Sequence, residues 1–418
     1  MAYVPPHMRH AKDAEKPPPK PELLVPQFWR SQNFGSTSRS NVGRGKGHNQ
    51  PSSQAGKIEY ANNTIYRWIA TGSPGDGQFP SYAGLETISL KSFEQRSAKP
   101  PLILVLDANV AQDVKESDGD VRKRPWEYVA ENVQEFLLSS FQNVLKARES
   151  KELEGKPTLV ARFGKILFRG KSLTNVEAGE RKSVSETTLK QMKRYLYTNL
   201  PVAFIQHVTS EAVPKLGLEF AEEKELYYVE LSDSMRPDSV LLFKCKVMED
   251  CKKLQVHKEH KIELTQVRHL TSDVSCLDKK LDLRLILYTK EVFTVFTDDE
   301  KHCIRNLVNS AVLNSEVKGG LRWPLGQETS GGRFTVVKTW HTNAKIFQGS
   351  SMRLKVRDAD RFDFLTSVGE VAREVSLKMT EISEPLKQND QVDLVTRMLE
   401  DNLRLIWECF LDCDCSFE

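Results

Sequence analysis

The chain has 418 residues, of which 39% are hydrophobic and 28% charged, a balance typical of sequences that bury a core in one large or two medium domains. No apolar run approaches the roughly 20 residues that span a bilayer, and the polar start lacks the apolar segment of a secretory signal. We therefore expect neither a membrane-spanning nor a secreted protein.

Charge is unevenly distributed along the chain. Residues 1–57 contain nine Lys or Arg against three Asp or Glu, a charge of +6, and eight of the 19 prolines. Such a segment cannot bury enough apolar surface to fold alone, which predicts a disordered basic N-terminal tail. A basic arm suits a polyanion such as RNA, or an acidic protein. The alternative is that the charge only keeps the tail in solution.

Seven cysteines occur at irregular spacing. The odd number favours free thiols in a reducing compartment over a disulfide framework. We expect a cytoplasmic protein, with the nucleus as the alternative location.

Helices and strands alternate in the first part of the body. A helix carrying Ile65, Trp68 and Ile69 is predicted up to Gly72, followed by a buried strand at 102–106. Pro125 opens the clearest helix, because its apolar residues recur at 3.6 spacing up to Leu145. A strand at 158–168, with a kink at Gly164, and a helix near 185–197, capped by Ser183 and Glu186, complete this part.

Period-2 alternation replaces the helical pattern from about residue 200. It predicts strands at 201–208, 226–231, 239–247, 262–268 and 281–289. In the last of these, the leucines from Leu281 to Leu287 point one way and Asp282 and Arg284 the other. That pattern indicates antiparallel strands with one face on a core.

Mixed elements return towards the C-terminus. Thr297 and Glu300 predict the capping box of a helix, and strands follow at 334–341 and 352–357. The apolar stripe from Phe362 to Met379 predicts a helix, and Asn389 is positioned to cap a last one.

Clustered strands favour an α+β fold, a mostly antiparallel sheet with flanking helices, over a doubly wound parallel fold. We expect three parts: the tail at 1–57, a main domain at 58–320, and a strand pair with C-terminal helices at 321–418 packed on that domain.

No catalytic signature was found in the sequence. Gly43, Gly45 and Gly47 lack the flanking strand and helix of a phosphate-binding turn. Neither the Cys and His residues between 251 and 269 nor Cys409, Cys413 and Cys415 match a zinc spacing. We therefore predict a protein that is not an enzyme, with no catalytic residue, metal or cofactor, and expect no small-molecule ligand.

The strand at 352–357 is the strongest binding candidate in the body. With Met352, Leu354 and Val356 on the core, Arg353, Lys355 and Arg357 form a row on the other face, beside Trp340 of the preceding strand. Basic residues next to an aromatic can hold a nucleic-acid backbone and stack bases. The alternative is a solvated edge strand protected by charge. In the tail, Arg39, Arg44 and Lys46 are candidates for weak RNA contact.

Two resemblances rest on longer stretches. Tyr3-Val4-Pro5-Pro6-His7-Met8-Arg9 resembles the YxPPHLR segment of DEAD-box RNA helicases and other RNA-processing proteins, with Met8 in place of Leu. It implies partner binding through Tyr3, Pro5, Pro6, His7, Met8 and Arg9. The stretches MAYVPPHMRHAKD, PELLVPQF and GKIEYANNTIYRWIATG resemble a plant family with a shared domain of unknown function, which implies no activity.

These observations support one leading hypothesis and two alternatives. The leading one is a non-catalytic protein associated with RNA or ribonucleoprotein through its tail, with RNA or translation factors as partners and no membrane contact. The alternatives are a protein–protein adapter without an RNA role and an enzyme whose site residues are dispersed along the chain.

Overall fold

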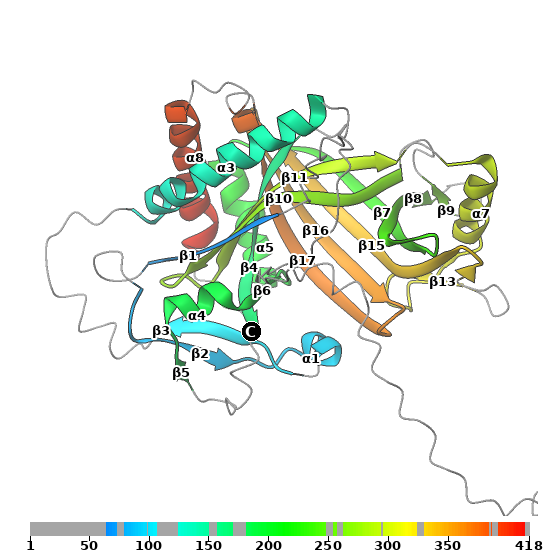
Figure 1. The fold of residues 1–418 in the computed structure, drawn as a ribbon, viewed down its shortest axis with the longest axis horizontal. Helices are drawn as coiled ribbons and strands as arrows, with labels where there is room; N and C mark the ends of the chain where they lie inside the picture. Colours follow the sequence, from blue (N-terminus) through cyan, green and yellow to red (C-terminus); the bar gives the residue numbers. More distant parts are fainter. Residues whose placement is uncertain are drawn as a thin grey trace, which may run out of the picture. The chain divides into compact units, whose positions relative to one another are not determined.

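The computed structural model describes residues 64–72, 79–97, 99–106, 124–149, 157–169, 181–247, 254–256, 262–293, 296–323, 330–383, 386 and 392–413. All of them belong to one compact unit, Gly56–Glu418. Its architecture is α+β with a large, mostly antiparallel sheet, as predicted (Figure 1). None of the helices described has the length and apolar character needed to cross a membrane.

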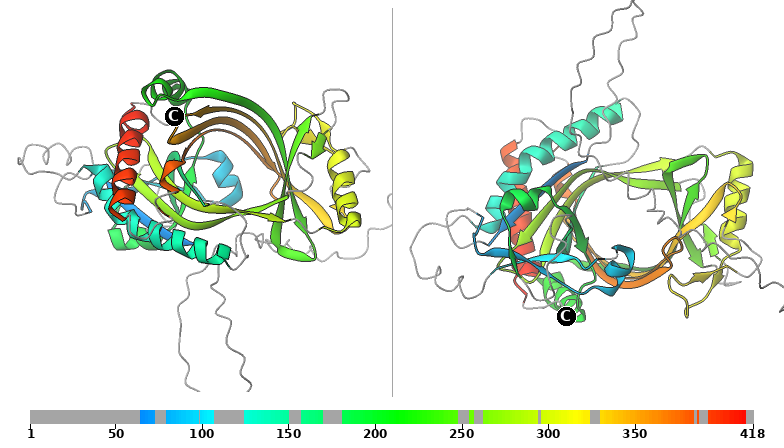
Figure 2. Two further views of the ribbon diagram at one scale, coloured as in Figure 1. Left: turned by 90° about the horizontal axis from the view of Figure 1, so that it is seen from above. Right: turned by 60° about the horizontal axis from the view of Figure 1, so that its bottom comes forward.

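The largest sheet closes on itself (Figure 2). Each strand of this closed sheet is antiparallel to the next, in the order β10 (Ile262–Cys276), β8 (Arg236–Val247), β7 (Glu219–Asp233), β15 (Phe334–Gln348), β16 (Met352–Asp363), β17 (Val368–Met379), β4 (Thr158–Arg169) and β11 (Asp282–Phe293). β11 then pairs with β10 and completes the circuit. The contact between β8 and β10 is the shortest, with Leu241 and Leu242 opposite Leu264 and Glu263.

Helices cover the outside of the closed sheet on one side. α3 (Pro125–Glu149), α5 (Val202–His207) and α8 (Val392–Ile406) lie there, and a π-helical turn, Trp407–Leu411, extends α8 (Figure 2). Leu285 of β11 and Leu377 of β17 share a core with Val133 and Leu399 of these helices. Side chains alternate between the two faces of a closed sheet, so the residues between these apolar positions form its inner face.

Two smaller cores flank this one. On the opposite outer side, α7 (Asp298–Asn309) packs Ile304 on Phe243 of β8, and its capping box of Thr297 and Glu300 is confirmed. The third core lies under β2 (Ala83–Thr87), β3 (Leu102–Leu106), β6 (Lys193–Tyr197) and α4 (Glu186–Gln191).

The other elements are short: α1 (Lys91–Ser97), β5 (Lys182–Ser183), α6 (Val213–Lys215), β9 (Leu254–Val256), β12 (Val312–Leu313), β13 (Leu321–Arg322), β14 (Ser330–Gly331) and the turns Val208–Ala212 and Glu381–Ser383.

Gly164 marks the point where β4 changes partners. Residues before it pair with β11 and β17, and residues after it pair with β6 and β3. A Cβ atom at Gly164 would lie 2.1 Å from the carbonyl oxygen of Tyr197, so only glycine fits this approach.

Three predicted elements have the wrong type. Residues 65–71 form a strand, β1 (Ile65–Thr71), which pairs in parallel with β10, and residues 201–208 begin the helix α5 instead of a strand. The stripe from Phe362 to Met379 is the end of β16, a turn and β17. Its helical spacing is coincidental, because Val371 is 45% exposed while Val375, Leu377 and Met379 alternate into the core.

The helix predicted at 185–197 is shorter than expected. α4 ends at Gln191, its cap is Ser185, which accepts a hydrogen bond from the Thr188 amide, and β6 follows directly. The Arg194 guanidinium donates to the carbonyls of Leu189 (3.0 Å), Lys190 (3.2 Å) and Met192 (3.1 Å), and so ends the helix.

The packing of α8 makes a direct prediction. Leu399 is fully buried against the closed sheet, whereas Leu394 on the same helix is 42% exposed. We expect Leu399→Ala to lower the free energy of unfolding by about 2–5 kcal/mol, and Leu394→Ala to change it by roughly 0.5 kcal/mol or less. Urea denaturation measures both. Equal losses for the two variants would contradict this docking of α8.

Candidate functional site

The basic row of β16 lies on the inner face of the closed sheet. Leu354 and Val356 pack in the outer core, so Arg353, Lys355 and Arg357 point the opposite way. β16 is paired along its length with β15 on one side and β17 on the other. The edge-strand alternative is therefore wrong, and the row needs another explanation.

The strand register joins this row to charged residues far away in the sequence. Directly opposed positions on successive strands place their side chains on the same face of the sheet. One continuous inner row runs through Glu222, Ile346, Lys355, Ser376, Arg162, Arg284 and Asp273. Three cations with two carboxylates at the ends thus share one layer of the interior.

Among the described residues of the inner face, cations outnumber carboxylates. By the same register, the basic residues there are Arg162, Lys224, Lys244, Arg268, Arg284, Lys338, Arg353, Lys355, Arg357, Arg361 and Lys378. The acidic residues are Glu222, Glu230, Asp273, Asp282, Asp363, Glu370 and Glu374. The described residues of the inner face therefore carry a net positive charge.

Glu374 is the most heavily engaged carboxylate. It is 7% exposed and forms ion pairs with Arg357 and Arg361, while the Thr198 hydroxyl donates to it at 2.9 Å. Burial would raise the pKa of Glu374, but the charges of Arg357, Arg361 and Arg162 outweigh burial and hold the pKa well below its ordinary value. Glu374 therefore stays ionised and acts as the internal counter-ion of the cluster.

A second buried carboxylate, Asp273, neutralises another part of the interior. The Arg284 guanidinium donates to it through two nitrogens, at 2.5 and 3.1 Å, and Arg194 approaches to 3.4 Å. Burial lowers the pKa of Arg194, and the charge of Asp273 opposes that shift. Asp282 has a capping role, because it accepts the backbone amides of Ile166 (2.8 Å) and Cys276 (3.0 Å).

The inner face is open to solvent where β7 and β16 begin. Glu222 accepts from Lys224 at 2.6 Å and from Arg353 at 2.9 Å, and the side chains of Glu222, Lys224 and Arg353 are 36%, 41% and 39% exposed. Surface pairs of this kind exchange readily and contribute little to stability. A charged ligand can therefore compete for these groups.

Arg162 differs from the other cations of the inner face. No carboxylate among the described residues forms an ion pair with its guanidinium. Burial lowers its pKa to about 10, the charge of Glu374 opposes this shift, and those of Arg357 and Arg268 add to it. Burial lowers the pKa of Arg268 in the same way. Two half-buried guanidinium groups thus remain incompletely compensated.

An aromatic pair lies on the same inner face. Trp340 stands opposite Tyr228 on β7 and opposite Arg361 on β16. The rings of Trp340 and Tyr228 stack with centroids 5.1 Å apart and an angle of 13° between their planes. The structure thus places on one inner face four of the residues singled out in the sequence, namely Trp340, Arg353, Lys355 and Arg357.

The other residues singled out in the sequence are not found among the described charged and aromatic residues of the inner face. Tyr3 to Arg9, Arg39, Arg44 and Lys46 lie outside the described residues, as do Cys251, His257, His260 and Cys415. No group of three or more His, Cys, Asp or Glu that could hold a metal occurs within the described part of the chain. His269 pairs with the Thr289 hydroxyl at 2.8 Å, and burial lowers its pKa to about 4.

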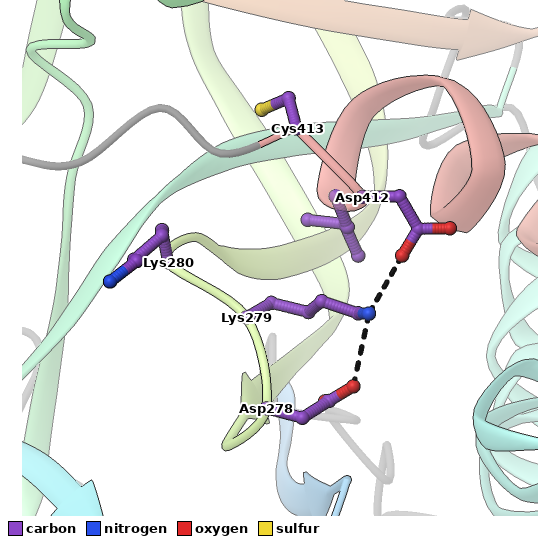
Figure 3. A pocket seen from close by; sticks show the side chains of 6 residues that line it. Asp278, Lys279, Lys280, Asp412 and Cys413 are labelled. Carbon is purple, nitrogen blue, oxygen red and sulfur yellow. Dashed lines mark ion pairs between the residues drawn. The ribbon is translucent and has the colours of Figure 1, made fainter.

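A surface hollow of about 220 Å³ lies between the β10–β11 turn and the C-terminal end of α8 (Figure 3). Lys279 bridges Asp278 at 3.1 Å and Asp412 at 2.7 Å across it. Cys413 lines the same hollow, where its thiol donates to the Phe410 carbonyl at 3.4 Å. These contacts tie the helical C-terminus to the sheet, and we interpret them as structural.

Comparison with known proteins identifies the family of this chain and several solved structures of low similarity to it. A family model described as "Domain of unknown function (DUF7903)" matches residues 52–410. No curated protein matches the chain. Similar solved structures include the S. pombe RNA triphosphatase Pct1 in complex with the Spt5 CTD, at 10% identity and a TM-score of 0.37, covering 68% of this chain and 93% of that one.

Two further similar structures are equally remote. The RNA triphosphatase domain of a trifunctional mimivirus mRNA capping enzyme has 7% identity and a TM-score of 0.28, covering 64% and 98% of the two chains. A putative adenylate cyclase from Bacillus halodurans has 8% identity and a TM-score of 0.23, covering 50% and 87%. None of these likenesses is close enough to assign an activity.

They do correct one expectation from the sequence. We predicted a protein that is not an enzyme because no catalytic motif was found, yet the similar structures include RNA triphosphatases and a putative adenylate cyclase. Motif searches depend on residues close together in sequence. Here the inner charged residues are spread from Arg162 to Lys378, so the missing motif excludes nothing.

The role of Glu374 as internal counter-ion is testable. Glu374→Gln leaves buried guanidinium groups without their carboxylate, and we expect it to lower the free energy of unfolding by about 3–5 kcal/mol at pH 7. The exposed Glu316→Gln in a surface turn is the matched control, with little expected effect.

The pH dependence provides a second readout. Because the pKa of Glu374 is lower in the folded than in the unfolded state, its contribution is present above the unfolded pKa and is lost as the pH falls towards the folded value. Denaturation at several pH values should show a shallower acid loss for Glu374→Gln than for the wild type. Parallel acid profiles would contradict the assignment.

Proposed function

The chain belongs to the DUF7903 family, and we propose that the inner face of its closed sheet binds the phosphate chain of an oligophosphate ligand. The observation that carries this proposal is Arg162, a half-buried guanidinium without an ion-pairing carboxylate among the described residues, set in a row with Lys355 and Arg284. Guanidinium groups bind phosphate oxygens through paired, charge-assisted hydrogen bonds.

Energetics favour a ligand over a purely structural network. Removing a cation from water costs several kcal/mol unless an anion compensates it. Glu374 and Asp273 compensate part of the interior, but Arg162 and Arg268 are left with lowered pKa values. An oligophosphate would supply several negative charges at once, and it would reach them where Glu222, Lys224 and Arg353 meet solvent.

We propose RNA or a nucleotide as the bearer of the phosphate chain. The tail supports this, because its +6 charge suits a polyanion. In this proposal Tyr3 to Arg9 contact a protein or RNA partner, and Arg39, Arg44 and Lys46 contact the RNA backbone.

Calorimetric titration of the full chain with tripolyphosphate tests the interior. We expect binding that weakens as salt is added. Arg162→Met should lower the affinity roughly tenfold to a hundredfold, since it removes a charge-assisted contact of about 1.5–3 kcal/mol. Arg397→Met on the exposed side of α8 is the matched control and should leave the affinity unchanged.

The outcome that contradicts the proposal is equal affinity for the two variants, or no binding by the wild type. Orthophosphate release from the same samples, with and without divalent cations, reports whether binding leads to hydrolysis.

The role of the tail has its own test. Deletion of residues 1–57 should strongly reduce RNA recovered by ultraviolet crosslinking in cells, while tripolyphosphate binding by the remaining chain persists. Unchanged RNA recovery would show that the tail does not contact RNA.

A further inference from the structure

The stacked pair of Tyr228 and Trp340 differs from the other aromatic contacts of the closed sheet. The neighbouring pair Tyr227 and His341 stacks on the outer face, with ring centroids 4.4 Å apart, and Tyr227 belongs to the core under α7. Neither Tyr228 nor Trp340 belongs to any of the three apolar cores. The inner pair therefore lies outside these three cores, with Tyr228 7% exposed and Trp340 partly exposed.

The surroundings of the inner pair are charged. Lys244 stands opposite Tyr228, and Arg361 stands opposite Trp340. Glu230 and Lys338, two residues along their strands from the aromatic pair, form an ion pair at 3.1 Å. Aromatic side chains in charged surroundings are typical of surfaces that bind nucleotides, where a base stacks on the ring and the cations hold phosphates.

Tyr228 is the one ring that stacks on Trp340 among the described residues. The guanidinium of Arg361, the neighbour of Trp340 on the other side, turns to Glu374 and Glu370. Among the described residues, no second aromatic or cation stacks on the indole. Trp340 is partly exposed, so a planar group can reach it.

The spacing to the basic rows suits a nucleotide. Arg357 lies four residues from Arg361 along β16, and Lys355 and Arg353 follow at alternate positions. At about 3.3 Å per residue, the aromatic pair stands roughly 13 Å from Arg357. The sugar and first phosphate of a nucleotide would cover part of this distance, and the outer phosphates together with the long Arg357 side chain would cover the rest, with Lys355 and Arg162 beyond it.

We propose that Tyr228 and Trp340 form a nucleoside subsite, so that the interior takes an oligophosphate carried on a nucleoside in preference to the bare phosphate chain. This inference rests on the proposed function, because it assumes that the phosphates occupy the basic rows. Free nucleoside triphosphate and the 5′-triphosphate end of an RNA share this chemistry.

The test compares tripolyphosphate with ATP and GTP on the full chain by calorimetry. Stacking of a base on an aromatic side chain predicts that the nucleotides bind about fivefold to 150-fold more tightly than tripolyphosphate. Trp340→Leu should remove this advantage and leave tripolyphosphate binding unchanged, and Trp340→Phe should restore part of it. Trp126→Leu on α3, outside the closed sheet, is the control and should keep the full preference.

Titrations with two RNAs distinguish free nucleotides from RNA 5′-triphosphate ends as the ligand. A short RNA with a 5′-triphosphate and the same RNA with a 5′-hydroxyl are titrated into the wild type and Trp340→Leu. Tight binding of the triphosphorylated RNA that depends on Trp340 identifies RNA ends as the ligand, whereas Trp340-dependent binding of ATP or GTP alone identifies free nucleotides, and either result supports the subsite.

Equal affinity for nucleotides and tripolyphosphate overturns the subsite but leaves the phosphate site intact. An equal loss of nucleotide and tripolyphosphate binding in Trp340→Leu also overturns it, because the indole would then only support the fold. Failure of the wild type to bind tripolyphosphate, or binding unaffected by Arg162→Met, removes the phosphate site and the subsite together.

Discussion

Closure of the sheet is the constraint on which the rest of this structure depends. Once β11 joins β4 to β10, one face of every strand in the circuit points inward. The outer face is apolar, and its leucines and valines are buried under α3, α8 and α7. The inner face must be either packed with apolar side chains or kept polar and internally compensated.

In this chain the inner face is polar, and its charges are only partly compensated. Carboxylates such as Glu374 and Asp273 bind two arginines each, and they allow buried charge to persist. Arg162 and Arg268 interact with more distant charges of the interior, and burial lowers their pKa values. Incompletely compensated charge in a protein interior often marks a functional site. Both the fold and the proposed ligand site therefore follow from the same inward-facing charges.

Much of the architecture was predictable from local patterns. The alternation of Leu281 to Leu287 with Asp282 and Arg284 predicted both faces of β11, and the capping box of Thr297 and Glu300 predicted the start of α7. The prediction of a helix after Phe362 was wrong because a 3.6-residue spacing of apolar residues occurred by chance in a strand. Pairing of β17 with both β16 and β4 outweighed any helical preference there.

The site was predictable only in fragments. Arg353, Lys355 and Arg357 were recognised as a row because they alternate within one short strand. Arg162, Arg284 and Glu374 were missed, since nothing local connects residues so far apart in the sequence. Their common signal is a charged residue between apolar neighbours in a strand, as in Ala161-Arg162-Phe163. That signal becomes specific only when the closed register places such residues in one row.

A crystal structure of the full chain grown with tripolyphosphate tests the central claim most directly. The proposed function predicts the anion inside the closed sheet, with its oxygens on Arg162 and Lys355 and with Glu374 still paired to Arg357. An anion bound only to the outer surface, or an interior in which Arg162 contacts no phosphate oxygen, would contradict it.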